Sequence, residues 1–353
     1  MKNVLKKVFL SLLCIILLLL TFAYIFFHKE IKTLKTITKV NDYPLYAMEY
    51  HGDYGFEEFL DVGAKTDEEL VSYVKNNLMH GLPFDVEIPS LGCSTFSAMN
   101  KDQEHIFGRN FDLGYSPSML IKTDPDHGYA SISMVNLGFL GYNKEQLPDH
   151  MFQALLTLGA PYAPLDGMNE KGLTAGVLLI PTDETHQDNK KVDLTTTTAI
   201  RLILDKAATV EEAIELLSHY DMHSSANSCY HFHIADAKGN SVVIEYVENK
   251  MVVIRADKHY QAATNFLLAE GDFDFGVGQD RHQTMMNTLD RKNAQLSDDD
   301  ALHLLHDVSQ KDVQFENLGK ISTQWSALYN SKDLTVTIVT GMDYCNAYVF
   351  ELN

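Results

Sequence analysis

Strand-like segments come in neighbouring pairs from residue 93 onward, and this order limits the possible folds more than any other feature of the chain. One pair, 93–99 and 105–111, flanks the turn Asn100-Lys101-Asp102. Strand pairs separated by runs of helix predict antiparallel sheets with segregated helices, an α+β arrangement. Two such sheets with helices outside form a four-layer αββα sandwich. The other strand-like segments are 44–50, 129–138, 172–180, 231–235, 241–247, 250–256, 325–329, 334–339 and 347–352.

Two consecutive helical segments, 194–207 and 209–219, lie between these strands. Apolar residues recur at helical spacing in the second segment, and Thr209 with Glu212 has the spacing of a capping box. Further helices are predicted at 67–78, 280–289 and 298–308.

The N-terminus predicts a membrane anchor. Residues 8–27 carry no charge and follow a lysine-rich start. About 20 such residues form roughly 30 Å of helix, the thickness of a bilayer core. The stretch ends in Ala23-Tyr24-Ile25-Phe26-Phe27, without the small residues of a signal-peptidase site. We therefore expect one transmembrane helix, a signal anchor over 1–28, with the catalytic domain extracytoplasmic. A secreted protein is the alternative.

Charge and cysteine content exclude several classes of partner and cofactor. The formal net charge of −20 would repel a phosphate backbone, so nucleic acid is not expected as a partner. Neither the cysteines nor the histidines show metal-ligand spacing, so no metal or cofactor is predicted. A disulfide between Cys229 and Cys345 remains open.

Cys93 is the candidate nucleophile. A cysteine at the start of a strand is commonly a small buried packing residue. If the hairpin turns near Lys101-Asp102, however, Cys93 lies across from Phe111, with Arg109 and Asp112 close by. A cation beside a cysteine favours the nucleophilic thiolate. Strict alternation puts Arg109 and Asp112 on opposite faces, so both can serve Cys93 only if the strand bends or ends near Asp112. Alternatively, Arg109 and Asp112 form an ion pair at the surface and do not serve Cys93.

Five motifs in order resemble the choloylglycine hydrolase and penicillin V acylase family, together with the related acid ceramidases and isopenicillin N acyltransferases. The resemblance covers about residues 90–353. It rests on Gly92-Cys93-Ser94-Thr95, Gly108-Arg109-Asn110-Phe111-Asp112, Asp166 to Leu173, Thr264-Asn265 with the later Arg281, and Thr323 to Tyr329 with the closing strands.

This resemblance implies an N-terminal-nucleophile (Ntn) hydrolase with the αββα fold. The chain would be cut between Gly92 and Cys93 and would use the new α-amine as its base. Residues 29–92 would be a linker and a propeptide that stays bound as a small subunit, and 93–353 the catalytic domain. Two departures are visible: no proline follows Asn265 closely, and 92 residues precede the cysteine where the bile-salt and penicillin branches have few.

The resemblance also implies a role for each site residue. Arg109 would stabilise the thiolate, and Asp112 would hold the α-ammonium. Asn265 and Asn169 would donate hydrogen bonds to the oxyanion, and Arg281 would organise the site. For Asn169 a plain turn residue is an equal alternative.

The predicted function is hydrolysis of the linear amide bond of an N-acyl substrate, without a cofactor. Bile-salt conjugates, penicillin V, N-acyl lipids and acyl amino acids all remain open as substrates. An acyltransferase on the same site, or a membrane-anchored binding protein that has lost catalysis, are the alternatives. A homo-oligomer is compatible with the sequence.

Overall fold

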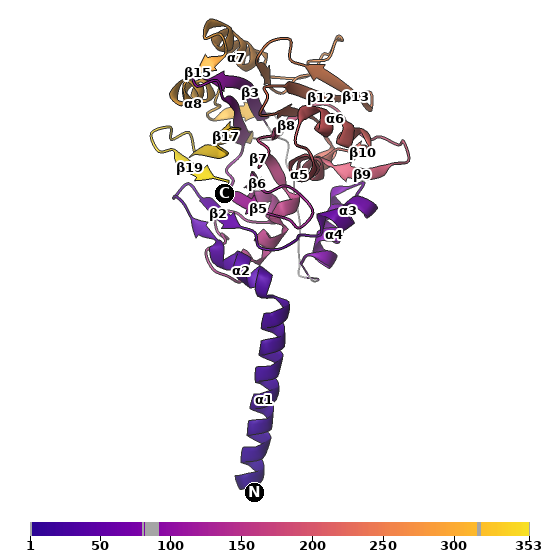
Figure 1. Cartoon of the computed structure of the whole chain (residues 1–353), viewed down its shortest axis with the longest axis vertical. Helices are drawn as coiled ribbons and strands as arrows, with labels where there is room; N and C mark the ends of the chain where they lie inside the picture. Colours follow the sequence, from indigo (N-terminus) through magenta and orange to yellow (C-terminus); the bar gives the residue numbers. More distant parts are fainter. Residues whose placement is uncertain (1, 80, 82–91, 316–318, 353) are drawn as a thin grey trace.

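The computed structural model describes residues 2–79, 81, 92–315 and 319–352. A long helix, α1, leads into a layered body (Figure 1). The helices are α1 (Lys2–Phe26), α2 (His28–Thr36), α3 (Phe56–Val62), α4 (Asp67–Asn77), α5 (Thr196–Lys206), α6 (Val210–Ser218), α7 (Gln279–Arg291) and α8 (Asp298–Asp307). Short 3-10 helices are η1 (Leu137–Leu140), η2 (Gln153–Tyr162) and η3 (Ser225–Asn227).

Two large sheets make up the body. Within the described residues the first sheet has nine strands, in the order β1 (Thr38–Lys39), β2 (Leu45–Glu49), β5 (Ser118–Thr123), β6 (Ser131–Asn136), β7 (Pro164–Asn169), β8 (Thr174–Ile180), β11 (Cys229–Ala235), β12 (Ser241–Val247) and β13 (Lys250–Arg255). The second runs β14 (Gln261–Ala263), β3 (Gly92–Asn100), β4 (His105–Leu113), β17 (Gly319–Asn330), β18 (Thr335–Thr340) and β19 (Tyr348–Glu351). Two short strands, β15 (Gln295–Leu296) and β16 (Val313–Phe315), pair with β3 and β17.

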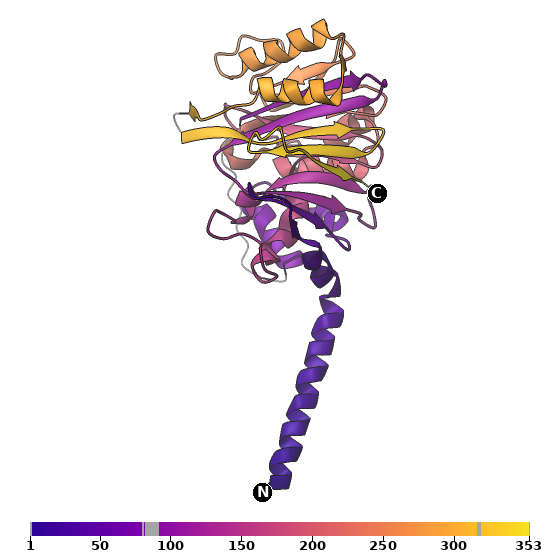
Figure 2. The ribbon, with the colours of Figure 1, turned by 90° about the vertical axis from the view of Figure 1, so that its left-hand side faces the viewer.

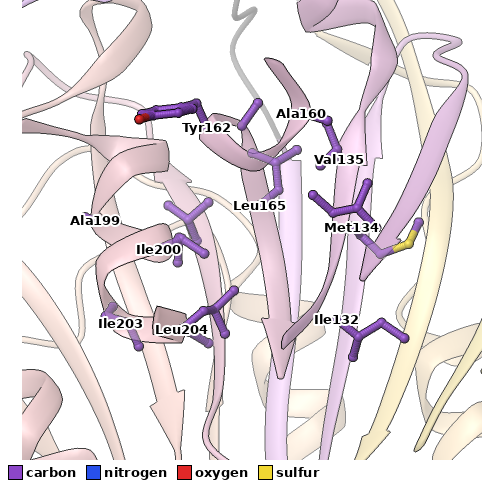
Figure 3. Close-up of a cluster of buried hydrophobic side chains, with 14 of the residues drawn as sticks. Ile132, Met134, Val135, Ala160, Tyr162, Leu165, Ala199, Ile200, Ile203 and Leu204 are labelled. Atoms are coloured by element: carbon purple, nitrogen blue, oxygen red, sulfur yellow. The ribbon is translucent and has the colours of Figure 1, made fainter. Parts of the chain in front are cut away.

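Helices cover the outer face of each sheet, as the αββα prediction requires. Side chains of α5 pack on β7 of the nine-stranded sheet, with Ile200 and Leu204 near Leu165 (Figure 3). On the other side, α7 and α8 lie over the sheet that contains β3 (Figure 2). Phe96 of β3 and Met285 of α7 share a buried cluster there. The prediction of an α+β fold is confirmed.

The sheets are antiparallel with three exceptions. Strand β2 pairs with β5 in parallel, β15 pairs with β3 in parallel, and β9 (Val192–Thr195) forms a separate parallel pair with β10 (Tyr220–His223). Because β2 precedes Cys93 in the chain, the segment before the expected cleavage point is part of the large sheet.

The predicted membrane anchor is wrong. Residues 2–26 do form a helix. None of the helices in the described part of the chain combines the length and the apolar character that crossing a bilayer requires.

Local signals agree with the helix boundaries. The Thr209 side chain accepts a hydrogen bond from the Glu212 N–H, as a cap should. The Glu212 carboxylate turns back to the Ala208 N–H instead of the cap residue, so only half of the predicted capping box forms. All four cysteines are free, and the Cys229–Cys345 disulfide does not form.

The turn between β3 and β4 is held by Glu104. Its carboxylate accepts hydrogen bonds from Lys332 Nζ at 2.7 Å, Asn330 Nδ2 at 2.9 Å and Asn100 Nδ2 at 2.8 Å. Lys332 first, then the two amides, lower the pKa of Glu104 to about 2. A carboxyl group whose pKa is lowered by folding stabilises the folded protein at pH values above its pKa in the unfolded chain, about 4.5 here. This stabilisation disappears as the pH falls towards 2.

We therefore expect Glu104→Gln to be less stable than the wild type at pH 6, with the difference shrinking as the pH is lowered towards 3. Urea unfolding at both pH values measures this. The matched control is Glu145→Gln at an exposed loop position, which should show little difference at either pH. If the free energies of unfolding of Glu104→Gln and the wild type differ as much at pH 3 as at pH 6, the prediction is contradicted.

Candidate active site

The candidate nucleophile lies at the start of β3, in the space between the two sheets. Cys93 pairs with Phe111, as the hairpin prediction required, and its side chain is fully buried. Arg109 Nη2 lies 3.3 Å from the Cys93 sulfur, and the Asp112 backbone N–H also points at it. Burial raises the pKa of the Cys93 thiol, and the Arg109 guanidinium opposes that rise. Arg109 thus favours the thiolate, against the burial that on balance keeps the pKa of the Cys93 thiol above its ordinary value.

A buried carboxylate holds Arg109 in place. Arg109 Nε donates to Asp166 Oδ2 at 2.8 Å, and both side chains have no exposed surface. Asp166 also accepts from Trp325 Nε1 at 3.2 Å and from the Tyr329 hydroxyl at 2.5 Å. Gly176 leaves room for the arginine, because a Cβ there would lie 3.3 Å from Arg109 Cδ. The guanidinium is therefore held against the sulfur by Asp166, which Trp325 and Tyr329 fix in turn.

Asn265 and Arg281 hold the backbone of the candidate nucleophile. The Cys93 N–H donates to Asn265 Oδ1 at 2.9 Å, and Arg281 Nη2 donates to the same oxygen at 2.8 Å. Arg281 Nη1 donates to the Cys93 carbonyl at 2.9 Å. Asn265 Nδ2 donates to the Leu179 carbonyl at 2.8 Å. An amide nitrogen has two protons, so one N–H of Asn265 is left for another acceptor.

Asp112 lies on the other face of β4, as alternation predicts. Its carboxylate accepts from Thr323 Oγ1 at 2.6 Å and pairs with Arg281 Nη1 at 3.2 Å. Burial raises the pKa of Asp112, and Arg281 and Thr323 oppose that rise. The two faces meet at Arg281, which contacts both Asp112 and the Cys93 carbonyl at the end of the strand. A register shift in β17 opposite Asp112 and Phe111 marks this end.

Gly92 is closely surrounded. Gly92, the first residue of β3, pairs with Asp112 of β4. A Cβ on Gly92 would lie 3.1 Å from Ile321 Cδ1 and 3.2 Å from Asp112 Cβ. A larger residue would push these neighbours apart.

The structure does not bring Asn169 to the site. Its Nδ2 donates to the Leu204 and Ala207 carbonyls, at 2.9 and 2.7 Å, at the end of α5. Its Oδ1 accepts from the N–H groups of Lys171 and Leu173. This amide is fully used in a turn. Asp166 lies three residues earlier on β7. It is the residue of that motif whose side chain reaches the site, through its contact with Arg109.

Sequence reasoning missed Asp166, Thr323 and Tyr329 as partners of the site. Asp166 stood within the Asp166–Leu173 motif, and an acid flanked by Pro164-Leu165 and Gly167-Met168 was a usable signal. Thr323 and Tyr329 also lay in a quoted motif, but only the pairing of β17 with β4 shows what they contact.

A cavity with both polar and apolar lining residues includes Leu267, two positions after Asn265 in the chain. Ile180, which follows the carbonyl bound by Asn265, packs with Leu267 in a small buried cluster. Leu267, Phe273 and Phe275 line a cavity of about 280 Å³, with Asp183 and Glu248 among its polar lining residues. In the described ranges, no group of three or more His, Cys, Asp or Glu side chains is arranged to hold a metal ion.

Comparison with known proteins identifies the family. Residues 93–302 match the linear amide C–N hydrolases of the choloylglycine hydrolase family, and the match begins at Cys93. The chain belongs to this family. The description of this family is that of hydrolases that act on the carbon–nitrogen bonds of linear amides.

Two curated proteins resemble parts of this choloylglycine hydrolase family member. Penicillin V acylase of Pectobacterium atrosepticum is 34% identical over 111 residues, which are 28% of this chain and 29% of that protein. Bile salt hydrolase/transferase of Clostridium perfringens is 26% identical over 183 residues, 49% of this chain and 53% of that protein. Both alignments cover less than two thirds of the relative.

Two solved structures share the fold. A mutant conjugated bile acid hydrolase from Clostridium perfringens aligns with a TM-score of 0.55 at 17% identity, over 74% of this chain and 92% of that one. Penicillin V acylase from Agrobacterium tumefaciens aligns with a TM-score of 0.50 at 17% identity, over 74% and 86% of the two chains.

Proposed function

We propose that this protein is a cysteine-type N-terminal-nucleophile amidohydrolase that cuts itself between Gly92 and Cys93 and then hydrolyses an N-acyl amide. One observation carries the proposal: Arg109 Nη2 lies 3.3 Å from the Cys93 sulfur, while Asn265 holds the Cys93 nitrogen at 2.9 Å. The same residue thus offers an activated sulfur and a nitrogen already positioned as a future amine.

In the first step, the Cys93 sulfur attacks the Gly92 carbonyl carbon. The C–N bond breaks, the Cys93 nitrogen takes a proton, and Gly92 is held briefly as a thioester. Water then hydrolyses the thioester, giving a Gly92 carboxylate and the free thiol. The absence of a side chain on Gly92 leaves the carbonyl open to this attack.

In the second step, the free α-amine of Cys93 does the proton transfers. Its pKa of about 8 is close to that of a thiol, so it can take the thiol proton and return it to the leaving amine. Arg109 stabilises the sulfur, and Asp112 with Arg281 surrounds the new N-terminus. The remaining Asn265 N–H donates to the tetrahedral oxyanion, an interaction worth about 2.7–4 kcal/mol in other enzymes. Water then releases the acyl group from sulfur.

The cavity lined by Leu267, Phe273 and Phe275 is the proposed site for the apolar part of the substrate. Its aromatic walls suit an acyl chain or ring, and the acids Asp183 and Glu248 disfavour an anionic group there. These walls support a binding mode in which the acyl group, and not a charged amine portion such as a sulfonate, occupies the cavity.

Enlarging this cavity should shift acyl preference towards longer chains. We expect Phe273→Ala to raise the ratio of kcat/KM for long over short N-acyl substrates by about 10-fold, since one methylene in an apolar pocket is worth 10-fold or more. Phe152→Ala, which removes an 87% exposed ring elsewhere, is the control. If Phe273→Ala and Phe152→Ala have equal ratios of kcat/KM for long over short substrates, the cavity does not bind the acyl group.

The N-terminal segment should stay bound after cleavage. Strand β2 adds to the large sheet beside β5, and three tyrosines tie the segment to the catalytic domain. Tyr43 donates to Gln324 at 2.8 Å, Tyr46 to Asp149 at 2.6 Å and Tyr54 to Asp205 at 2.7 Å.

We expect the processed protein to give two chains on a denaturing gel and one peak on gel filtration. Separation should require denaturant, because it would expose the β5 edge and the buried Tyr46 and Tyr54 rings. Two peaks in native buffer would contradict a retained subunit.

N-terminal sequencing of the purified protein tests the function directly. The large chain should begin Cys-Ser-Thr-Phe, and it should hydrolyse N-acyl amides. Turnover by uncut material would overturn the mechanism. Addition of an amine acceptor distinguishes hydrolysis from acyl transfer, since new amide product would appear only in the second case. Uncut, inactive protein would favour a binding role.

A further inference from the structure

A buried histidine and a buried glutamate lie beside the Asn265 segment. His231 on β11 and Glu245 on β12 have no exposed side-chain surface. His231 Nδ1 lies 3.0 Å from Glu245 Oε1, and His231 Nε2 lies 2.7 Å from the Thr264 carbonyl oxygen. Neither residue belongs to the motifs that carry the family resemblance.

The partners of His231 indicate its protonation. A backbone carbonyl can only accept, so Nε2 must carry a proton. The Glu245 carboxylate also accepts from the backbone N–H groups of Leu268 at 2.7 Å and Ala269 at 3.0 Å. These two backbone donors, one on each carboxylate oxygen, suit the ionised form of Glu245. An ionised carboxylate can only accept, so Nδ1 of His231 is inferred to be a second donor.

The neighbouring histidine on the same strand has different partners. His233 faces the hydroxyls of Thr95 and Ser241, which can donate or accept. Burial, with a contribution from His231, lowers the pKa of His233 to about 3, so this ring is neutral. His233 is equally buried and lies two residues away, which makes it a matched control.

Together, the two side chains clamp both ends of a short segment. His231 binds Thr264, and Glu245 binds Leu268 and Ala269. Asn265 lies between these contacts and holds the Cys93 nitrogen. We propose that His231 and Glu245 form a buried imidazolium–carboxylate pair that positions Asn265 against Cys93. This inference rests on the proposed function, and the two residues act as positioning residues because neither touches the reacting atoms.

Nitrogen-15 NMR of the histidine rings tests the protonation without any substrate. The sample is the full chain carrying Cys93→Ala, which prevents cleavage, and signals are assigned with His231→Gln and His233→Gln. At neutral pH we expect both ring nitrogens of His231 to carry protons and His233 to carry one. A His231 ring with one unprotonated nitrogen would overturn the ion pair.

Kinetics test the positioning. We expect Glu245→Gln and His231→Gln to lower kcat by about 10- to 100-fold with KM changed less than about 2-fold, because misplacing a reactive group by 1 Å can cost 10²-fold. His233→Gln should change kcat by less than about 3-fold. Equal kcat values for the His231 and His233 variants would overturn positioning.

A failure of the proposed hydrolase function can be distinguished from a failure of the positioning role of His231 and Glu245. If the wild-type protein does not hydrolyse amides, the proposed function fails, whatever the NMR result. If the wild type is active and the variants keep its kcat, only the positioning role fails. Should His231→Gln not fold, Glu245→Gln and the NMR signature still decide the question.

Discussion

Cys93→Ala is expected to abolish both self-cleavage and amide hydrolysis. The sulfur is the proposed nucleophile of both reactions, so its removal should leave a single full-length chain and lower kcat by about 10⁴-fold or more. Intact mass measurement reports the cleavage, and release of the amine from an N-acyl substrate reports the hydrolysis. Because alanine is smaller than cysteine, the buried site should still fold.

The control for this prediction is Cys345→Ala, which removes an exposed free thiol. It should be cleaved and active like the wild type. Cys93→Ser adds a second comparison, since a hydroxyl at the same place is a poorer nucleophile and should cleave slowly. Full activity of Cys93→Ala would exclude the cysteine mechanism altogether.

Asp166→Asn is expected to destabilise the protein by about 3–5 kcal/mol, because removing one partner of a buried ion pair leaves the other charge uncompensated. Arg109 would keep its position beside the sulfur without a counter-ion, and its Nη1 already lacks a hydrogen-bond partner among the described residues. Urea unfolding in the Cys93→Ala background measures this effect without interference from cleavage.

Two comparisons make the Asp166 result specific. Glu57→Gln breaks the ion pair between Glu57, whose side chain is 52% exposed, and Lys206. This change should lower the free energy of unfolding by less than about 1 kcal/mol. Replacing both buried partners, Arg109→Met with Asp166→Leu, should recover much of the loss, since an apolar pair carries no desolvation cost. Additive losses would show that the two charges do not stabilise each other.

Local patterns were sufficient to predict the part of the site that lies in one hairpin. The turn at Lys101-Asp102 sets the register of β3 and β4, and that register puts Cys93 across from Phe111 and Arg109 on its inward face. Period-two alternation also predicted that Asp112 points the other way. These are short-range consequences of strand geometry, so the sequence contains them.

The remaining contacts depend on chain segments far apart in sequence. Asn265 and Arg281 reach Cys93 from residues 172 and 188 positions away. No local pattern specifies such contacts, and family resemblance alone suggested these two residues. The same resemblance assigned Asn169 to the site. The motif Asp166–Leu173 contains four polar side chains, and only the tertiary structure shows that Asp166 is the one that faces Arg109.

The parallel addition of β2 to β5 has a practical consequence for anyone producing the catalytic part alone. A chain started at Cys93 would leave the backbone of Ser118–Thr123 without its neighbour, as an open row of donors and acceptors beside apolar side chains. Bare edges of this kind recruit other molecules. Such a truncated enzyme should precipitate or form aggregates unless residues 38–79 are supplied as a separate peptide during refolding.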